Sequence, residues 1–137
     1  KLISWGADVI YGSGPHVLQP IRYVEKPDGG KALVAYSLGN FISTEQKATN
    51  MGGGILDITY EKEYENNTVS IKDVTFIPTV THYNSNYSDI RIIPFSEYSA
   101  ELAQQHGVRK YQSQFSYEFI KEKFNTIIGE EFLKTTL

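Results

Sequence analysis

The sequence contains no cysteine, so it can form neither a disulfide nor a metal site built from thiolates. It is also poor in positive charge, because 13 Lys and Arg against 16 Asp and Glu give a net charge of -3. No basic stripe is present to neutralise phosphates, which argues against a nucleic-acid partner. No apolar run approaches the roughly 20 residues that a membrane-spanning helix needs.

The 137 residues are enough for one domain with a hydrophobic core, and 40% of them are apolar. Short apolar runs and alternating patterns predict strands as far as about residue 95, and helical periodicity follows. We therefore predict one unit, residues 1–137, with mainly strands in 1–95 and a tail of two or three helices in 96–137. The change near residue 95 separates sheet from helices and does not divide two domains.

Turn signals divide the first part into strands. Residues 27–30 (Pro-Asp-Gly-Gly) are a turn across which the flanking strands are expected to pair. Pro78 predicts that the long strand containing it ends at a sheet edge. The predicted strands are residues 7–12, 19–25, 31–37, 55–61, 68–79 and 90–95.

Capping and periodicity predict the helices of the tail. Ser96 is expected to cap a first helix, Glu97 to favour its positive end and His106 to lie at its close. A second helix has an apolar face and ends at Gly129. The residues of that face are Tyr117, Ile120, Phe124, Ile127 and Ile128.

The first six residues are typical of the last turn of a helix that Gly6 closes as a C-terminal cap. They contain neither an initiator Met nor the pattern of a signal peptide. We interpret the chain as a later part of a longer protein, in which any signal or anchor lies upstream.

Two loops at predicted strand ends carry the residues suited to chemistry. Residues 12–20 read Gly-Ser-Gly-Pro-His-Val-Leu-Gln-Pro, and residues 36–41 read Tyr-Ser-Leu-Gly-Asn-Phe. Each loop turns sharply on small residues and presents one polar side chain, His16 in the first and Asn40 in the second. A sheet scaffold commonly aims catalytic and binding groups from such loops.

Each of these residues has two interpretations. His16 suits a metal ligand or an acid–base group, or it is a loop histidine bonded to a backbone carbonyl. Asn40 is a site residue, or it occupies a left-handed turn position. The Gly-Ser-Gly run is not a nucleophile elbow, because Tyr11 and Pro15 stand where glycines are needed. It is not a dinucleotide-binding fingerprint either, because Val17 replaces the third glycine.

Three further features have ordinary interpretations. We predict that His82 is a surface residue and that the macrodipole of the first tail helix accounts for His106. Residues 83–87 contain Tyr83 and Tyr87 in a polar stretch. They form a polar loop with half-buried tyrosines, or a surface that stacks on a sugar or a polymer.

Together the two loops resemble the bacterial capsule synthesis family typified by CapA and PgsA, proteins of poly-γ-glutamate synthesis. The resemblance rests on residues 6–20 and 36–42, covers about residues 1–60 and extends to a later strand at 90–94. It implies an α/β fold that is part of a calcineurin-like metallophosphoesterase, a four-layer α/β/β/α sandwich.

The resemblance also implies a setting for the chain. It would be the C-terminal part of a longer protein whose upstream part carries further metal motifs and an N-terminal membrane anchor. The protein would then lie at the extracellular face of the bacterial cell membrane. Its partners would be the upstream part of the same chain and the machinery that makes or exports polyglutamate. A divalent metal, Mn or Zn, would be the cofactor of the full-length chain.

One position departs from the family pattern. The family loop commonly reads Gly-Ser-His-Pro-His with both histidines as metal ligands, whereas here Gly14 stands at the first and only His16 remains. A binuclear site arranges its ligands around two cations about 3.5–4 Å apart, so losing one imidazole weakens or remodels it. His16 is therefore the candidate metal ligand, and His16 and Asn40 are the candidate catalytic residues. Asp8 is expected to position the strand end.

Three functional hypotheses follow. The first is the C-terminal part of a CapA-like protein that acts in poly-γ-glutamate capsule synthesis or export. The second is an active metal-dependent phosphoesterase that upstream sequence completes. The third is a non-catalytic binding or assembly module that uses Tyr83 and Tyr87.

Overall fold

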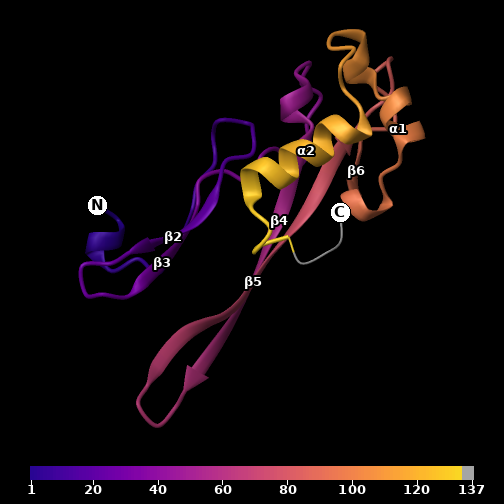
Figure 1. Cartoon of the computed structure of the whole chain (residues 1–137). Helices are drawn as coiled ribbons and strands as arrows, with labels where there is room; N and C mark the ends of the chain where they lie inside the picture. Colours follow the sequence, from indigo (N-terminus) through magenta and orange to yellow (C-terminus); the bar gives the residue numbers. More distant parts are fainter. Residues whose placement is uncertain (134–137) are drawn as a thin grey trace.

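The computed structural model describes residues 1–133 and contains two three-stranded sheets followed by helices (Figure 1). The first sheet has the order β1-β3-β2. In it, β1 (Val9–Tyr11) runs parallel to β3 (Lys31–Ala35), and β2 (Ile21–Glu25) pairs with β3 in an antiparallel hairpin. The predicted turn at 27–30 is thus confirmed. A short 3₁₀ helix, η1 (Ile3–Trp5), precedes the sheet and ends at Gly6, whose φ of 98° is left-handed.

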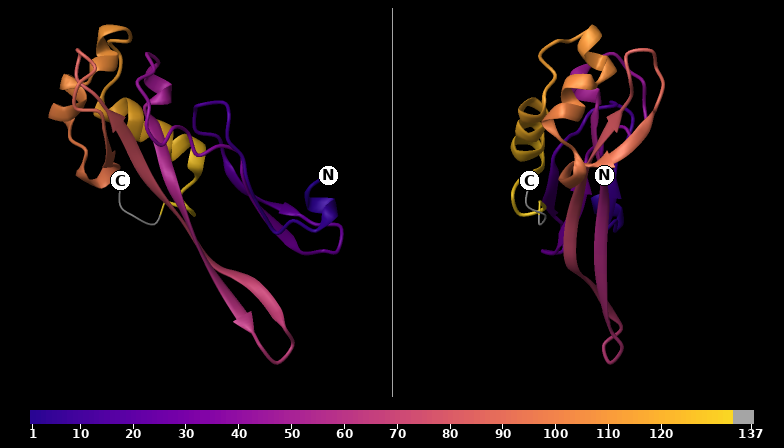
Figure 2. Two further views of the ribbon diagram at one scale, coloured as in Figure 1. Left: turned by 180° about the vertical axis from the view of Figure 1, so that it is seen from behind. Right: turned by 90° about the vertical axis from the view of Figure 1, so that its right-hand side faces the viewer.

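The second sheet is antiparallel, with the order β4-β5-β6. Its strands are β4 (Gly52–Glu63), β5 (Thr68–His82) and β6 (Arg91–Pro94). The far half of the β4–β5 hairpin extends away from the body of the molecule as an arm (Figures 1 and 2). The other half of this sheet, nearer the body, packs against the core and the loops described below.

The prediction that Pro78 ends its strand at an edge is wrong, because β5 is the central strand and continues to His82. The N–H of Gly54, opposite Pro78, donates to Leu38 O on the side away from β5. The two residues are therefore a pair without mutual hydrogen bonds. The nitrogen of Pro78 points to the other side, just past the last β5–β6 pair, Thr79 with Pro94. A missing N–H costs the ladder nothing there.

The tail is helical, as predicted, within the described residues, which leave out 134–137. It contains η3 (Phe95–Glu97), α1 (Ala100–Gln105), η4 (Gly107–Lys110) and α2 (Tyr117–Ile128). The second predicted helix is confirmed as α2. The predicted cap of the first is wrong: Ser99, not Ser96, accepts the backbone N–H of Leu102 and begins α1. No helix in residues 1–133 is long and apolar enough to cross a membrane.

The main core lies where α2 crosses the second sheet (Figure 1). Ile120, Phe124 and Ile128 of α2 are at most 1% exposed. The Phe124 ring lies 6.4 Å from that of Phe76 on β5 and 5.1 Å from that of Phe95. Burying a side chain of this size contributes about 1.5–3 kcal/mol each, so these contacts fix the helix on the sheet.

The segment after α2 connects the two sheets. The carbonyl of Phe132 accepts the N–H of Phe76 on β5 at 2.8 Å. Its ring lies 6.0 Å from that of Tyr23 on β2. Phe132 is 2% exposed, so one aromatic side chain is buried where the sheets come together. Residues 1–133 thus form an α/β arrangement of mainly strands, with two three-stranded sheets and two α-helices, consistent with an α/β fold class.

The prediction that His82 is a surface residue is wrong, because β5 continues into the core and leaves it 1% exposed. His106 follows α1 as its C-terminal cap, and it is 2% exposed. Its Nε2 donates to Thr81 O at 2.8 Å, and its Nδ1 accepts the N–H of Val108 at 3.0 Å. These contacts require a neutral ring, so His106 satisfies backbone groups and does not act as a cation against the helix macrodipole.

We expect acid to destabilise the protein through His106. Burial lowers the pKa of His106 from 6.5 to about 4, and desolvation also lowers the pKa of the adjacent His82. Between pH 6.5 and 4 the unfolded chain binds a proton at this histidine, whereas the folded chain excludes it. The free energy of unfolding is therefore highest above pH 6.5 and falls as the pH drops towards 4. The expected loss is about 3 kcal/mol, measured by urea unfolding at several pH values.

His106→Gln is the informative variant, because Gln can also donate to Thr81 O and does not titrate. Its unfolding free energy should depend less on pH between 6.5 and 4. An equal pH dependence of the unfolding free energy in wild type and His106→Gln would contradict the role of His106 in acid destabilisation.

Candidate functional site

The structure brings His16 and Asn40, which are 24 residues apart, into direct contact. Residues 12–20 follow β1 and residues 36–41 follow its parallel neighbour β3, so both loops begin at the same edge of the first sheet. His16 Nδ1 lies 2.9 Å from Asn40 Oδ1. A bridge between residues 18 and 38 holds the two loops together just beyond this contact. The two residues that the sequence singled out therefore lie side by side.

Glu45 and Asn50 complete the site. Glu45 Oε1 lies 3.0 Å from His16 Nδ1 and accepts Asn40 Nδ2 at 3.3 Å. Glu45 Oε2 accepts Asn50 Nδ2. Asn40 Nδ2 also lies 3.3 Å from the carbonyl oxygen of Asn50. We refer to His16, Asn40, Glu45 and Asn50 as the polar cluster.

Neither Glu45 nor Asn50 was predicted from the sequence. Glu45 stands in an irregular polar segment, and Asn50 ends a short 3₁₀ helix, η2 (Ala48–Asn50). No periodicity or motif marks either position. The available signal was weak: polar side chains within ten residues of Asn40 and ahead of the glycine run at 52–54.

The hydrogen-bond partners determine which nitrogen of His16 carries a proton. Asn40 Nδ2 faces Asn50 O and Glu45 Oε1, which can only accept, so the oxygen of Asn40 must face His16. Nδ1 therefore has two acceptors as neighbours and must be protonated. In the neutral ring Nε2 then carries the lone pair. The side chain is 61% exposed, so a cation or a proton can reach the ring from solvent.

The backbone angles and side-chain contacts of His16 and Asn40 bear on the interpretations left open for these residues. His16 has φ of 60°, in the left-handed region that costs a non-glycine residue roughly 1–3 kcal/mol at a functional site. Its Nδ1 contacts the side chains of Asn40 and Glu45. Asn40 is not among the described residues with positive φ, and Gly39, at 74°, takes the left-handed position. The side chain of Asn40 is thus used in the polar cluster, and its backbone makes no left-handed turn.

Glycines in β4 hold the loop that carries Asn40. Gly54 N–H donates to Leu38 O at 3.0 Å, and Gly39 forms a bridge with Gly53. A Cβ added at Gly53 would collide with the carbonyl oxygen of Asn40. This part of the loop therefore lies directly against the β4 backbone, and any side chain at Gly53 would push it away.

The end of β5 and the residue after it hold the part of the loop that carries Glu45. Tyr83 OH donates to Glu45 O at 2.8 Å, and Thr81 Oγ1 donates to Phe41 O at 3.3 Å. Tyr83 is 1% exposed, and burial raises its pKa to about 12, so it remains a donor at ordinary pH. Tyr83 is thus buried and not half-buried as predicted. Only Tyr87, which stacks on it at 5.4 Å, reaches the surface.

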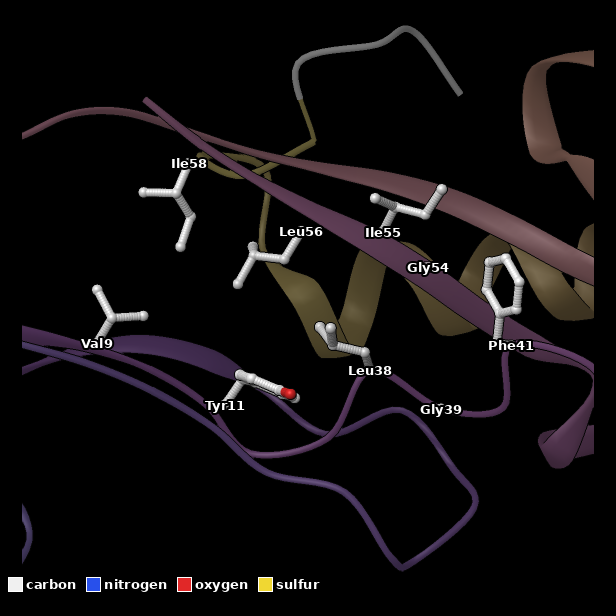
Figure 3. A pocket seen from close by; sticks show the side chains of 9 residues that line it. All are labelled: Val9, Tyr11, Leu38, Gly39, Phe41, Gly54, Ile55, Leu56 and Ile58. Atoms are coloured by element: carbon white, nitrogen blue, oxygen red, sulfur yellow. The ribbon is translucent and has the colours of Figure 1, made fainter. Parts of the chain in front are cut away.

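An apolar groove of about 420 Å³ lies between the two sheets beside the polar cluster (Figure 3). Val9 and Tyr11 of β1 line one side, and Leu56 and Ile58 of β4 line the other. Phe41 closes one end and is 62% exposed. The groove has the size of a small-molecule site, but none of the polar cluster lines it.

Asp8 and Gly14 lie apart from these contacts. Asp8, just before β1, accepts Lys26 Nζ at 2.7 Å and so ties this strand to the β2–β3 turn. Gly14 has φ of 125°, a conformation that side chains rarely adopt, although no atom lies within 4 Å of a Cβ built there. A side chain at this position would therefore have room for its Cβ but would strain the backbone.

The described residues do not by themselves form a metal site. Among residues 1–133 there is no group of three or more His, Asp or Glu side chains placed to hold an ion. The outward Nε2 of His16 suits a divalent cation, whereas both oxygens of Glu45 already accept hydrogen bonds. A transition metal takes three or four protein ligands, so His16 fits as one of a set that other residues would complete.

The fold and the polar cluster define an α/β protein that presents one histidine at the edge of a small sheet. Residues 1–45 match the family model described as the bacterial capsule synthesis protein PGA_cap. The match contains both loops and supports the resemblance of this part of the chain to bacterial capsule synthesis proteins. Comparison with curated proteins and with solved structures gave no match.

We expect Gly53→Ala to destabilise the protein, because the new methyl group collides with Asn40 O. Overpacking of this kind costs about 1–3 kcal/mol, which urea unfolding measures. Gly30→Ala is the matched control, because its Cβ would meet only flexible side chains, with Asp28 Oδ1 nearest at 3.3 Å. Similar losses in the two variants would show that the contact at Gly53 is not tight.

Proposed function

We propose that this chain is the C-terminal part of a CapA-like protein that acts in the synthesis or export of poly-γ-glutamate. One observation carries the proposal: the family match over residues 1–45 contains the two loops whose polar side chains meet in the structure. In this proposal the protein works at the extracellular face of the bacterial membrane, with an anchor in upstream sequence. Its partners are that upstream part and the machinery that handles the polymer.

The proposal includes the fold of the whole domain. The two sheets are taken as parts of a four-layer α/β/β/α sandwich of the metallophosphoesterase type. Two features support this interpretation. Within residues 1–133, β1 is an edge strand that pairs only with β3, so a further strand can pair with its other side. The groove beside it exposes Tyr11 and Phe41, which are apolar surfaces that a further layer would cover.

We also propose that His16 is one ligand of a divalent cation, Mn²⁺ or Zn²⁺, in the full-length protein. The support is its protonated Nδ1 and outward Nε2, the arrangement in which histidine binds metals. When bound, the cation would act as a Lewis acid on a phosphoryl or carbonyl oxygen. The chain's own contribution is to hold the imidazole: Asn40 and Glu45 orient it, and its exposure leaves it accessible.

Loss of His16 should weaken cation binding. In the full-length protein, we expect His16→Ala to reduce the affinity for Mn²⁺ or Zn²⁺ by at least about tenfold in calorimetric titration. Lys31→Ala is the matched control, because Lys31 is 62% exposed, close to the 61% of His16. Equal affinity in wild type and His16→Ala would exclude His16 as a ligand.

The cellular role can be tested in the host. Deletion of the whole gene should abolish polyglutamate in the capsule fraction, and His16→Ala should reduce it while the protein level stays unchanged. Lys31→Ala should behave as wild type. Undiminished polymer after whole-gene deletion would reject the function. Loss of polymer on deletion but not in His16→Ala would reject only the role of His16.

A further inference from the structure

We propose that Glu45 is a positioning residue for His16. Its carboxylate holds the ring as the Nδ1–H tautomer and so presents the Nε2 lone pair to solvent. The inference deepens the function proposed above, because a metal ligand or base at position 16 needs that lone pair. It concerns only hydrogen bonds within residues 1–133, however, and its test requires neither capsule polymer nor metal.

The chemistry of the polar cluster requires a carboxylate at position 45. Oε1 lies against two nitrogen groups, His16 Nδ1 and Asn40 Nδ2, while Oε2 accepts Asn50 Nδ2. Both side-chain oxygens must therefore accept. Glutamine has one acceptor oxygen and one donor NH₂ group. Because Asn50 is buried and its Oδ1 already accepts Thr49 Oγ1, the oxygen of Glu45→Gln would face Asn50 Nδ2 and its NH₂ group would face His16 Nδ1.

Glu45 is itself held more firmly than the histidine it orients. Its carbonyl accepts Tyr83 OH at 2.8 Å, and its N–H donates to Ser43 Oγ at 3.0 Å. Asn50, whose Nδ2 donates to Glu45 Oε2, is 4% exposed. Its own Oδ1 accepts Thr49 Oγ1 at 3.0 Å. A buried amide thus fixes the carboxylate, and the carboxylate fixes an exposed ring. This is the order of support expected for a histidine that must hold one orientation.

The segment around Glu45 is anchored on two further sides. Ala48 N–H donates to Gln112 Oε1 at 2.8 Å, between the helices of the tail. Gln46 Nε2 donates to Tyr87 OH at 2.9 Å. Residues far apart in the sequence therefore hold the segment in place, and the carboxylate does not depend on His16 for its position.

The tautomer can be read directly by NMR. Histidine without a directing partner prefers the Nε2–H form, so a His16 ring in the Nδ1–H form would report the pull of Glu45 and Asn40. We would record long-range ¹H–¹⁵N spectra of the full-length protein with ¹⁵N-labelled histidine at pH 8. His16→Gln assigns the signal. His106, whose Nε2 donates to Thr81 O, serves as the opposite tautomer in the same spectrum.

The expected wild-type result is a protonated Nδ1 and a bare Nε2 at His16, with a clear shift towards Nε2–H in Glu45→Gln. Glu25→Gln, the same chemical change at an exposed residue of β2, should leave His16 unchanged. An unchanged His106 signal in each variant shows that the fold is intact.

Two results would overturn the inference. The first is an Nε2–H ring at His16 in the wild type, which requires no variant and so cannot be confused with misfolding. The second is an unchanged His16 tautomer in a folded Glu45→Gln protein. Neither result bears on the capsule function, which gene deletion tests separately. Conversely, the expected tautomer together with an unaffected capsule would leave this inference standing and reject the function.

Discussion

The close approach of residues 38–40 to the glycine-rich start of β4 is the constraint on which the site depends. Leu38 O takes the N–H of Gly54, which β5 leaves free, and Gly53 has no side chain to separate the two backbones. This contact attaches the loop after the first sheet to the edge of the second. It thereby fixes the position from which the side-chain amide of Asn40 contacts His16.

Buried residues of the second sheet and the tail support an exposed histidine of the first sheet. Tyr83 OH and Thr81 Oγ1 hold the loop that carries Glu45, and His106 in turn holds the carbonyl of Thr81. The rings of His82 and His106 lie 4.9 Å apart in this support. Burial keeps His106 neutral, and the hydrogen bonds that hold this loop depend on the buried rings being uncharged. Stability in the core and geometry at the surface are therefore connected through hydrogen bonds.

The polar cluster and its supports come partly from the segment that matches the family model and partly from the rest of the chain. Residues 1–45, which match bacterial capsule synthesis proteins, supply His16, Asn40 and Glu45. The rest of the described chain supplies Asn50, the anchoring hydroxyl of Tyr83 and the far wall of the groove. The matched segment thus contains the groups that face solvent, and the remainder provides much of the support that orients them.

Features that depend on neighbouring residues could be predicted from the sequence alone. The turn at 27–30 predicted the β2–β3 hairpin, and apolar spacing with Gly129 predicted α2. Small residues at two strand ends singled out His16 and Asn40 as the polar side chains presented there.

The contacts between these elements depend on the three-dimensional fold. Glu45 and Asn50 join the polar cluster only because the loop folds back against β4 and β5, so no local pattern could identify them. His82 is buried because β5 runs on past Pro78, where the missing N–H faces no neighbouring strand. In both cases hydrogen bonds between distant segments made the choice, and their energy is absent from the short-range patterns that a sequence displays.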